Sequence, residues 1–430
     1  MKPPESVPPT AIGLFVGKGG VGKSTCAAAS AVVQACAGNR VLLISTDQAH
    51  SVGDVLGVAV TPSGARDARE AVAVTLDDAA PQTGSLEVLA LDTLALLEAH
   101  WVGVADVLAA RFPESDLGSV APEELSALPG IQEVLGLHEV VELADSRRWD
   151  LVVVDCASTA DAMRMLTLPA TVALYAERSW PRHRRLSGTE DPRSTALVEL
   201  IERVSGAAER LAERLTDETS VAAHLVLTAE RVVAAEAVRT LGALSLSGVR
   251  VAELIVNQIL PQDDSYAYDN LPAHPAFDWY TARIGEQQRV LEELDRAIGD
   301  VAMVLVPHLA GEPIGPRALG ELLDSSRRRD GSAPPGPLRP VVDRESGSGL
   351  GAVYRLRLEL AQVDSGALRL GRSGDDLIIG AGATRRRVRL ASVLRRCTVS
   401  DATLRGSELT VRFRPDPRLW PASADEEVRR

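Results

Sequence analysis

Uninterrupted apolar runs recur along the first three quarters of the chain and alternate with stretches of helical periodicity. The first run, residues 11–16, ends at Gly17 and is followed by an alanine-rich helical stretch that ends at Gly38. Apolar strands without polar alternation are buried on both faces, and the helices between them cover a parallel sheet. The pattern therefore predicts an α/β fold. Further strands are expected at residues 41–46, 85–92, 149–156, 223–230, 251–258 and 301–308.

Two long segments interrupt this alternation. Residues 93–146 and 175–220 have helical periodicity and contain no strand-like run. Because both fall between predicted strands of one sheet, we expect them to form a helical subdomain inserted into the α/β body.

The pattern changes near residue 325. Residues 326–351 are rich in Pro, Gly and Ser, which is typical of a linker. Beyond them, "YRLRLEL" (354–360) alternates strictly, and residues 386–390 and 408–413 alternate in part. Period-two alternation predicts antiparallel strands with one solvated face. We therefore expect an α/β domain over 1–325, a small all-β domain over 352–418 and a tail over 419–430.

Composition and charge narrow the classes of function. The chain has 430 residues and a formal net charge of −13, which disfavours a nucleic-acid partner. Its four cysteines form no CxxC pair, so neither a disulfide framework nor a structural zinc site is predicted. The polar N-terminus lacks an apolar signal region, and no uninterrupted apolar run reaches about 18 residues. These features predict a cytoplasmic protein.

The stretch "GKGGVGKS" (17–24) carries the clearest chemistry. It fits the phosphate-binding pattern G-x-x-x-x-G-K-[ST] and stands between a predicted strand and a predicted helix, which is the context the pattern requires. The chain has only three lysines, and two of them are in this loop, at Lys18 and Lys23. Lys23 should reach the β- and γ-phosphates, and the Ser24 hydroxyl should bind Mg²⁺. We predict ATP and Mg²⁺ as ligands, with nucleotide contacts at Gly19, Gly20, Val21, Gly22, Lys23, Ser24 and Thr25.

Four further blocks accompany this loop in order along residues 11–325. They read "STDQAHS" (45–51), "VVVDCASTADAMRMLTLP" (152–169), "IVNQILP" (255–261) and "VPHLAGEPIGPRAL" (306–319). Together they resemble the arsenical pump-driving ATPase family, which includes the ATPase of the guided entry of tail-anchored proteins. The resemblance implies that Lys18 crosses a dimer interface to the partner's nucleotide, so a homodimer is expected. The alternative for Lys18 is a solvated surface lysine.

The resemblance also implies roles for single residues. Asp47 would orient the attacking water or accept its proton, although it could instead cap a helix. Asp155, at the end of a predicted strand, would hold the Mg²⁺ shell. Asn257 would read adenine, unless it is only a turn residue, and Pro307 belongs to the loop that covers the base.

Some positions depart from the family pattern. Gln48 stands where the family has proline, and Ser158, Ala160 and Asp161 replace the proline, glycine and histidine of switch II. Because lost Gly and Pro change how a loop moves, we expect weak turnover. The cysteines that bind zinc or arsenite in some family members have no counterpart, so a zinc-stapled dimer is not expected.

Residues 352–414 resemble the small heat-shock, or α-crystallin-like, β sandwich found in some members. The resemblance rests on "YRLRLEL", "GDDLIIG", "RRRVRL" and "SELTVRF". A generic β appendage is the alternative. Such a domain could pair edges with a dimer partner or cover a helical groove.

The function expected from these features is a Mg-ATP-driven homodimeric switch. It would bind a hydrophobic protein client or membrane-protein segment, and the apolar residues of 91–112 could line the groove or simply pack together. The alternatives are the energising subunit of an anion pump, a partition or positioning ATPase, and a binding module that has lost turnover.

Overall fold

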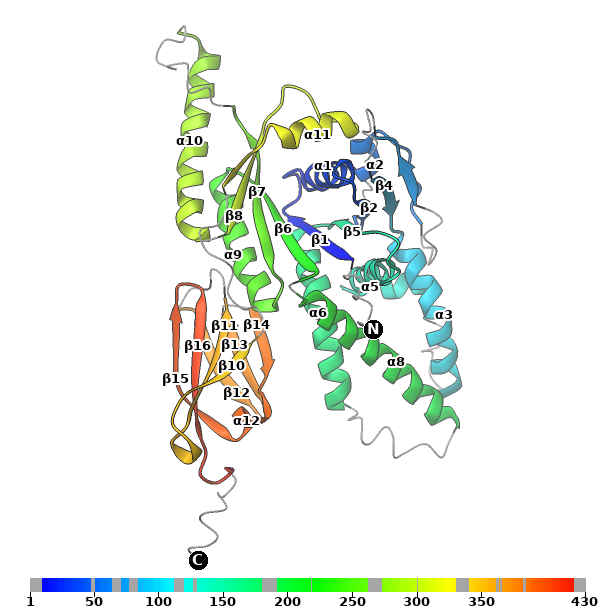
Figure 1. Ribbon diagram of the computed structural model, residues 1–430. Coiled ribbons are helices and arrows are strands. Elements are labelled where there is room, and N and C mark those ends of the chain that lie inside the picture. The colour runs from blue at the N-terminus through cyan, green and yellow to red at the C-terminus, as the bar shows by residue number, and fades with distance from the viewer. Residues whose placement is uncertain are drawn as a thin grey trace, which may run out of the picture.

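The computed structural model describes the chain as an α/β body with a C-terminal β sandwich (Figure 1). The N-terminal α/β body carries the phosphate loop, and the sandwich adjoins one of its helices. The described residues are 10–47, 51–63, 71–76, 84–111, 120–126, 130–179, 192–217, 219–261, 273–299, 301–329, 340–360, 363, 366–381 and 384–420.

A nine-stranded sheet forms the centre of the α/β body, in the order β3-β4-β2-β5-β1-β6-β7-β8-β9. The seven central strands are parallel, and only the short edge strands β3 and β9 run antiparallel to their neighbours. The parallel α/β fold expected from the apolar runs is therefore confirmed, and the edge strands are additions to it. The strands are β1 (Ala11–Gly17), β2 (Arg40–Ser45), β3 (Val72–Val74), β4 (Ser85–Ala90), β5 (Leu151–Asp155), β6 (Val221–Thr228), β7 (Val251–Ile259), β8 (Ala302–Pro307) and β9 (Arg327–Arg329).

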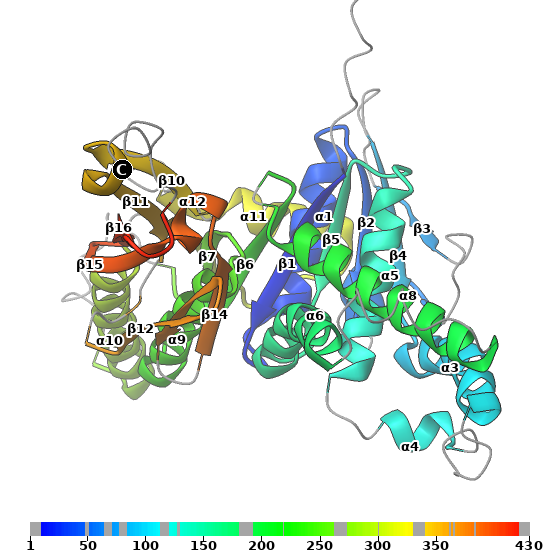
Figure 2. The same ribbon diagram turned by 90° about the horizontal axis from the view of Figure 1, so that it is seen from below.

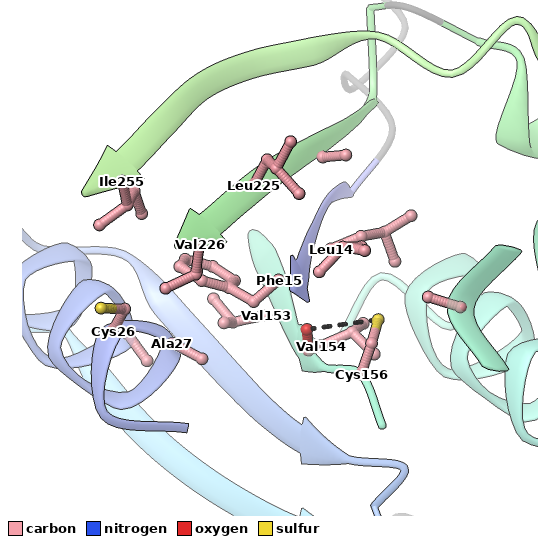
Figure 3. Close-up of a cluster of buried hydrophobic side chains, with 14 of the residues drawn as sticks. Leu14, Phe15, Cys26, Ala27, Val153, Val154, Cys156, Leu225, Val226 and Ile255 are labelled. Carbon is pink, nitrogen blue, oxygen red and sulfur yellow. Dashed lines mark hydrogen bonds between the residues drawn. The ribbon is translucent and has the colours of Figure 1, made fainter. Parts of the chain in front are cut away.

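Helices cover the two faces of this sheet (Figure 2). On one face, α1 (Lys23–Cys36) packs against α2 (Ser51–Leu56) and α11 (Pro316–Asp324). On the other, α9 (Arg231–Ser247) packs against β6, α6 (Thr159–Ser179) and α10 (Pro275–Ile298). Figure 3 shows how the core fills between sheet and helix, with Cys26 and Ala27 of α1 facing side chains from β1, β5, β6 and β7.

The described part of the helical subdomain contains five helices. They are α3 (Thr93–Arg111), α4 (Pro122–Ser126), α5 (Ile131–Asp145), α6 and α8 (Pro192–Leu215). Helix α3 packs against α5 and α8, and α6 packs against α8. The second helical segment of this subdomain begins with α6 at Thr159, and not at residue 175 as expected. Pro169 usually marks a helix boundary, but here it lies inside α6.

The C-terminal domain is built from two antiparallel sheets. One has the order β10-β11-β16-β15 and the other β12-β13-β14. Their inward residues, including Leu356, Val411 and Phe413, form a separate core. The expected β sandwich is thus confirmed. Its elements are β10 (Val341–Ser346), η4 (Gly349–Gly351), β11 (Val353–Glu359), β12 (Leu368–Ser373), β13 (Asp376–Ala381), β14 (Thr384–Arg389), α12 (Ser392–Arg395), β15 (Cys397–Arg405) and β16 (Glu408–Pro415).

Two short strands lie within the range predicted as a linker, 326–351. Strand β9 pairs with β8 at the edge of the large sheet, and β10 pairs with β11 at the edge of the sandwich. Both are edge strands with few buried side chains, so neither carries the apolar run that identified the central strands. Arg328 and Arg329 of β9 instead form ion pairs with Glu253 and Asp295.

Helix α9 also joins the two domains. Leu246, in its last turn, is only 2% exposed because it packs into the core of the β sandwich. Arg386 of β14 donates a hydrogen bond to the Ser245 carbonyl at 3.4 Å, and burial lowers the pKa of this guanidinium to about 10. Because free carbonyls and the helix dipole attract cations at a helix C-terminus, Arg386 caps α9 from the other domain.

We predict that Leu246→Ala lowers the free energy of unfolding by about 2–5 kcal/mol, because it opens a cavity where the domains meet. Val232→Ala on the same helix is the matched control. Val232 is 71% exposed, so its truncation should cost less than about 0.5 kcal/mol. Urea unfolding of both variants measures the difference, and equal costs would show that the sandwich is not docked through Leu246.

Candidate phosphate-binding site

The phosphate loop connects the end of β1 to the start of α1. Two of its glycines are sterically required. A Cβ at Gly17 would lie 2.2 Å from the Val226 carbonyl oxygen, and Gly22 has a φ of +89°. Residues 18–20 are exposed, whereas Val21 is buried against the sheet. The loop therefore presents an open backbone on a fixed base, as phosphate binding requires.

Lys23 is the first residue of α1 and is buried. Its Nζ donates a hydrogen bond to the Lys18 carbonyl at 3.4 Å, so the side chain folds back across the loop. An ammonium group held over an exposed glycine loop places a compact positive charge where phosphate oxygens would bind.

Ser24 and Asp155 come together as predicted for a metal site. Ser24 Oγ donates to Asp155 Oδ2 at 2.7 Å and lies 2.7 Å from the hydroxyl of Ser51. Asp155 is fully buried at the end of β5, and its Oδ1 has no hydrogen-bond partner among the described residues. A buried carboxylate oxygen without a partner, beside a hydroxyl, fits the oxygen ligands or ligand-bound waters that Mg²⁺ prefers.

The electrostatics of Asp155 reflect its position. The pKa of this carboxyl is raised to about 6, mainly by burial and to a smaller extent by the nearby charge of Asp47. The hydrogen bond from Ser24 and the charge of Lys23 act in the opposite direction. The hydrogen bond from Ser24 and the charge of Lys23 therefore offset only part of the cost of burying this carboxylate, and a bound cation would stabilise it.

Asp47 follows β2 and faces the space beyond the loop. Its backbone N–H donates to Ser45 Oγ at 3.3 Å, and its side chain helps to line a cavity of about 330 Å³. Cys156 and Asp161, from the segment after β5, line the same cavity, as do residues of α5. None of the lining residues belongs to the phosphate loop, so the cavity extends from Asp47 towards the helical subdomain. Gln48 lies outside the described residues.

Lys18 has a different environment from Lys23. Its side chain is half exposed, and its Nζ lies 3.7 Å from Glu236 Oε2 on α9. Exposed ion pairs of this kind contribute about 0–1 kcal/mol, so the lysine can leave Glu236 at little cost. Sequence reasoning missed Glu236, because no local pattern links residues more than 200 positions apart.

Asn257 lies directly against the phosphate loop. Its Nδ2 donates to the Val21 carbonyl at 3.0 Å, and a Cβ on Gly22 would meet Nδ2 at 2.2 Å. The structure thus gives Asn257 a bracing contact that was not predicted. Pro307, expected in the base-covering loop, ends β8 next to Ile259 of β7. The prediction that Asn257 reads adenine remains a prediction.

The residues that depart from the family in switch II form a capping box. The Ser158 N–H donates to Asp161 Oδ2 and the Asp161 N–H donates to Ser158 Oγ, both at 3.3 Å. This reciprocal arrangement fixes the first turn of α6. Arg164 then pairs with Asp161 and, at 3.4 Å, with Glu133 of α5. The segment after Asp155 is therefore tied to the helical subdomain.

The sequence also matches a known protein family and several known proteins. Residues 10–325 match the family described as anion-transporting ATPase, and residues 351–413 match the HSP20-like domain found in ArsA. Protein Rv2184c of Mycobacterium tuberculosis is 69% identical, with 95% of this chain and 97% of that protein covered. A Prosthecochloris vibrioformis protein named an arsenical pump-driving ATPase is 24% identical over 93% and 95% of the two chains. The ATPase GET3 of Kluyveromyces lactis is 28% identical over 77% and 91%.

We predict that Asp155→Asn stabilises the nucleotide-free protein by about 1–3 kcal/mol at pH 8, because it removes a buried charge. A carboxyl with a raised pKa costs stability above its folded pKa, so the gain should shrink as the pH falls from about 6 towards 4. Unfolding curves at several pH values measure this.

The matched control is Asp150→Asn. The hydrogen bond from Arg40 lowers the pKa of Asp150, so its charge is stabilising above its unfolded pKa. This variant should lose stability at pH 8. A loss in both variants at pH 8 would contradict the buried-charge interpretation of Asp155.

Proposed function

The chain belongs to the anion-transporting ATPase family, and from this premise we propose that it is a Mg-ATP-driven homodimeric switch that binds and releases a hydrophobic protein segment. Members of this family are ATPases. The observation that carries the proposal is the contact between Ser24 and Asp155 beside the open phosphate loop. It provides the hydroxyl and carboxylate that an ATPase needs at the magnesium position.

Each residue of the site has a physical role in this proposal. The amides of residues 19–25 and the Lys23 ammonium bind the phosphates, and Ser24 with Asp155 would hold Mg²⁺. The ion, when bound, supplies positive charge to the phosphate oxygens. Asp47 orients the attacking water and accepts its proton. Phosphoryl transfer then depends mainly on positioning and charge neutralisation.

The proposed homodimer gives Lys18 its function. Lys18 is exposed and held only by a partly exposed ion pair with Glu236. In the dimer it would leave this pair and neutralise the phosphates bound by the partner subunit. A switch of this kind closes when nucleotide is bound and opens after hydrolysis.

The proposed client site is the helical subdomain. Exposed apolar side chains occur on three of its helices, at Val102, Val172 and Val204. Arg164 connects this subdomain to the segment that follows Asp155. The same ties, with the capping box, support the proposal of slow turnover, because they must rearrange when the switch moves.

A second candidate is the energising subunit of an anion pump. The family description and the name of the Prosthecochloris relative favour it. The four cysteines of this chain are all free and lie on different elements. Cys26 and Cys36 are in α1, Cys156 follows β5, and Cys397 begins β15. Soft ligands of that kind would have to converge to bind arsenite, so this chain fits an arsenite pump less well than a client-binding switch.

We predict that Asp47→Asn lowers the single-turnover rate of ATP hydrolysis by about 10²–10⁴-fold, because the water loses its base. Nucleotide affinity should change by less than about threefold. Asp54→Asn, an exposed residue of α2, is the control and should hydrolyse at the wild-type rate. Equal rates for wild type and Asp47→Asn would remove Asp47 from the mechanism.

We also predict that wild type becomes dimeric when ATP and Mg²⁺ are added and that Lys18→Ala stays monomeric. Glu236→Gln breaks the ion pair but keeps the lysine, so it should still dimerise. Analytical ultracentrifugation with and without nucleotide distinguishes these states. A wild type that is monomeric with bound ATP would overturn the role of Lys18 across the interface.

A further inference from the structure

Among the residues that the structure describes, α4, α5 and α8 cover the apolar helix α3 only in part. The stretch Thr93–Ala110 is long and apolar enough, by length and composition, to cross a membrane, yet only 17% of it is buried. An apolar helix in a protein core is mostly buried. Val102 is the large apolar side chain that α3 exposes among the described residues, and contiguous exposed apolar surface marks a place where another molecule binds.

The exposed side of α3 has a specific composition. Glu98, Val102 and Asp106 are four residues apart and therefore share one face. Val102 is 64% exposed, and Ala99 and Gly103 beside it are exposed as well. A Cβ added at Gly103 would meet nothing within 4 Å, so there is free space above the helix. Small residues let a second helix approach closely, and here an acid stands at each end of that surface.

The charge around this face is strongly negative. Residues 93–145 contain ten acidic residues and one basic residue, Arg111, which is a net charge of −9. The whole chain carries −13, so most of its excess charge lies in the part of the helical subdomain that includes α3. Glu123 and Glu124 of the adjoining α4 are exposed, like Glu98 and Asp106. Glu133 pairs with Arg164 and Asp145 with Arg214, so the negative potential over α3 comes mainly from its exposed acids and those of α4.

We propose that α3 binds an apolar helical segment flanked by lysine or arginine residues. This inference rests on the proposed client-binding function and specifies the client's chemistry. Basic flanks at the ends of such a segment would be attracted by Glu98 and Asp106, because exposed charges act over about 8 Å, the Debye length at physiological salt. A second copy of α3 carries the same acids and is repelled, and so is a bilayer rich in anionic lipid. Charge therefore favours a helix with basic flanks over a second copy or an anionic bilayer, which apolar contact alone would not distinguish.

Three synthetic peptides test the inference with the full chain and a non-hydrolysable ATP analogue. All share one apolar helix of about 18 residues, long enough to match α3, and differ only in flanks of Lys, Ser or Glu. We expect the Lys peptide to bind about 5–20-fold more tightly than the Ser peptide, and the Glu peptide to bind least. The advantage should fall below about twofold in 0.5 M NaCl, because salt screens exposed charges.

Charge reversal locates the effect. Glu98→Lys with Asp106→Lys should remove or invert the preference for the Lys peptide. Glu293→Lys with Asp324→Lys, exposed residues of α10 and α11, is the control with the same change in net charge and should keep it. All four positions are exposed, so the variants should fold, and thermal unfolding checks this.

The outcomes separate the two proposals. Equal binding of all three peptides would overturn the charge inference and leave client binding in place. Failure of every peptide to bind would overturn client binding and this inference with it. If the protein instead self-associates and Val102→Asp abolishes that association, the occupant is a second copy, and the inference is wrong.

Discussion

The buried contact between Asp155 and Ser24 is the constraint on which the site depends. Apolar strands on both sides bring β5 next to β1, and this places a carboxylate in the interior directly below the phosphate loop. Its pKa is raised to about 6, because burial outweighs the Ser24 hydrogen bond and the Lys23 charge. The nucleotide-free protein therefore carries an electrostatic cost that a ligand cation would relieve, and this links binding to stability.

Helix α9 connects the phosphate loop to the C-terminal β sandwich. Its Glu236 meets Lys18 of the phosphate loop, while Leu246 and the carbonyl of Ser245 contact the β sandwich. The β sandwich therefore packs against the ATPase domain and supports the C-terminal end of α9. A position on the C-terminus of α9 explains why Arg386 is half-buried, whereas the preceding Arg385 is exposed.

The central strands and the phosphate loop could be predicted because their signals are local. Continuous apolar runs define β1, β2 and β5, and the glycines with Lys23 and Ser24 define the loop. Edge strands β9 and β10 lack such runs, since their side chains face solvent or pair with acids. The contacts of Asn257 with Val21 and of Lys18 with Glu236 join distant segments, so only the fold reveals them. The capping box of Ser158 and Asp161 was different, because its S-x-x-D spacing was visible in the sequence but was interpreted only as a departure from the family.

Charge gives the helical subdomain a selectivity that its apolar surface lacks. Apolar burial is non-directional, so an open apolar helix such as α3 would also attract a second copy or a lipid surface. Glu98 and Asp106 act against both, because like charges repel across such a contact. In the sandwich, by contrast, Arg355 and Arg412 pair with Asp343 and Glu345, so that surface is neutralised within the domain. The acids of α3 remain without comparable basic neighbours in their own segment, which is the arrangement expected where the counter-charge is supplied by a bound partner.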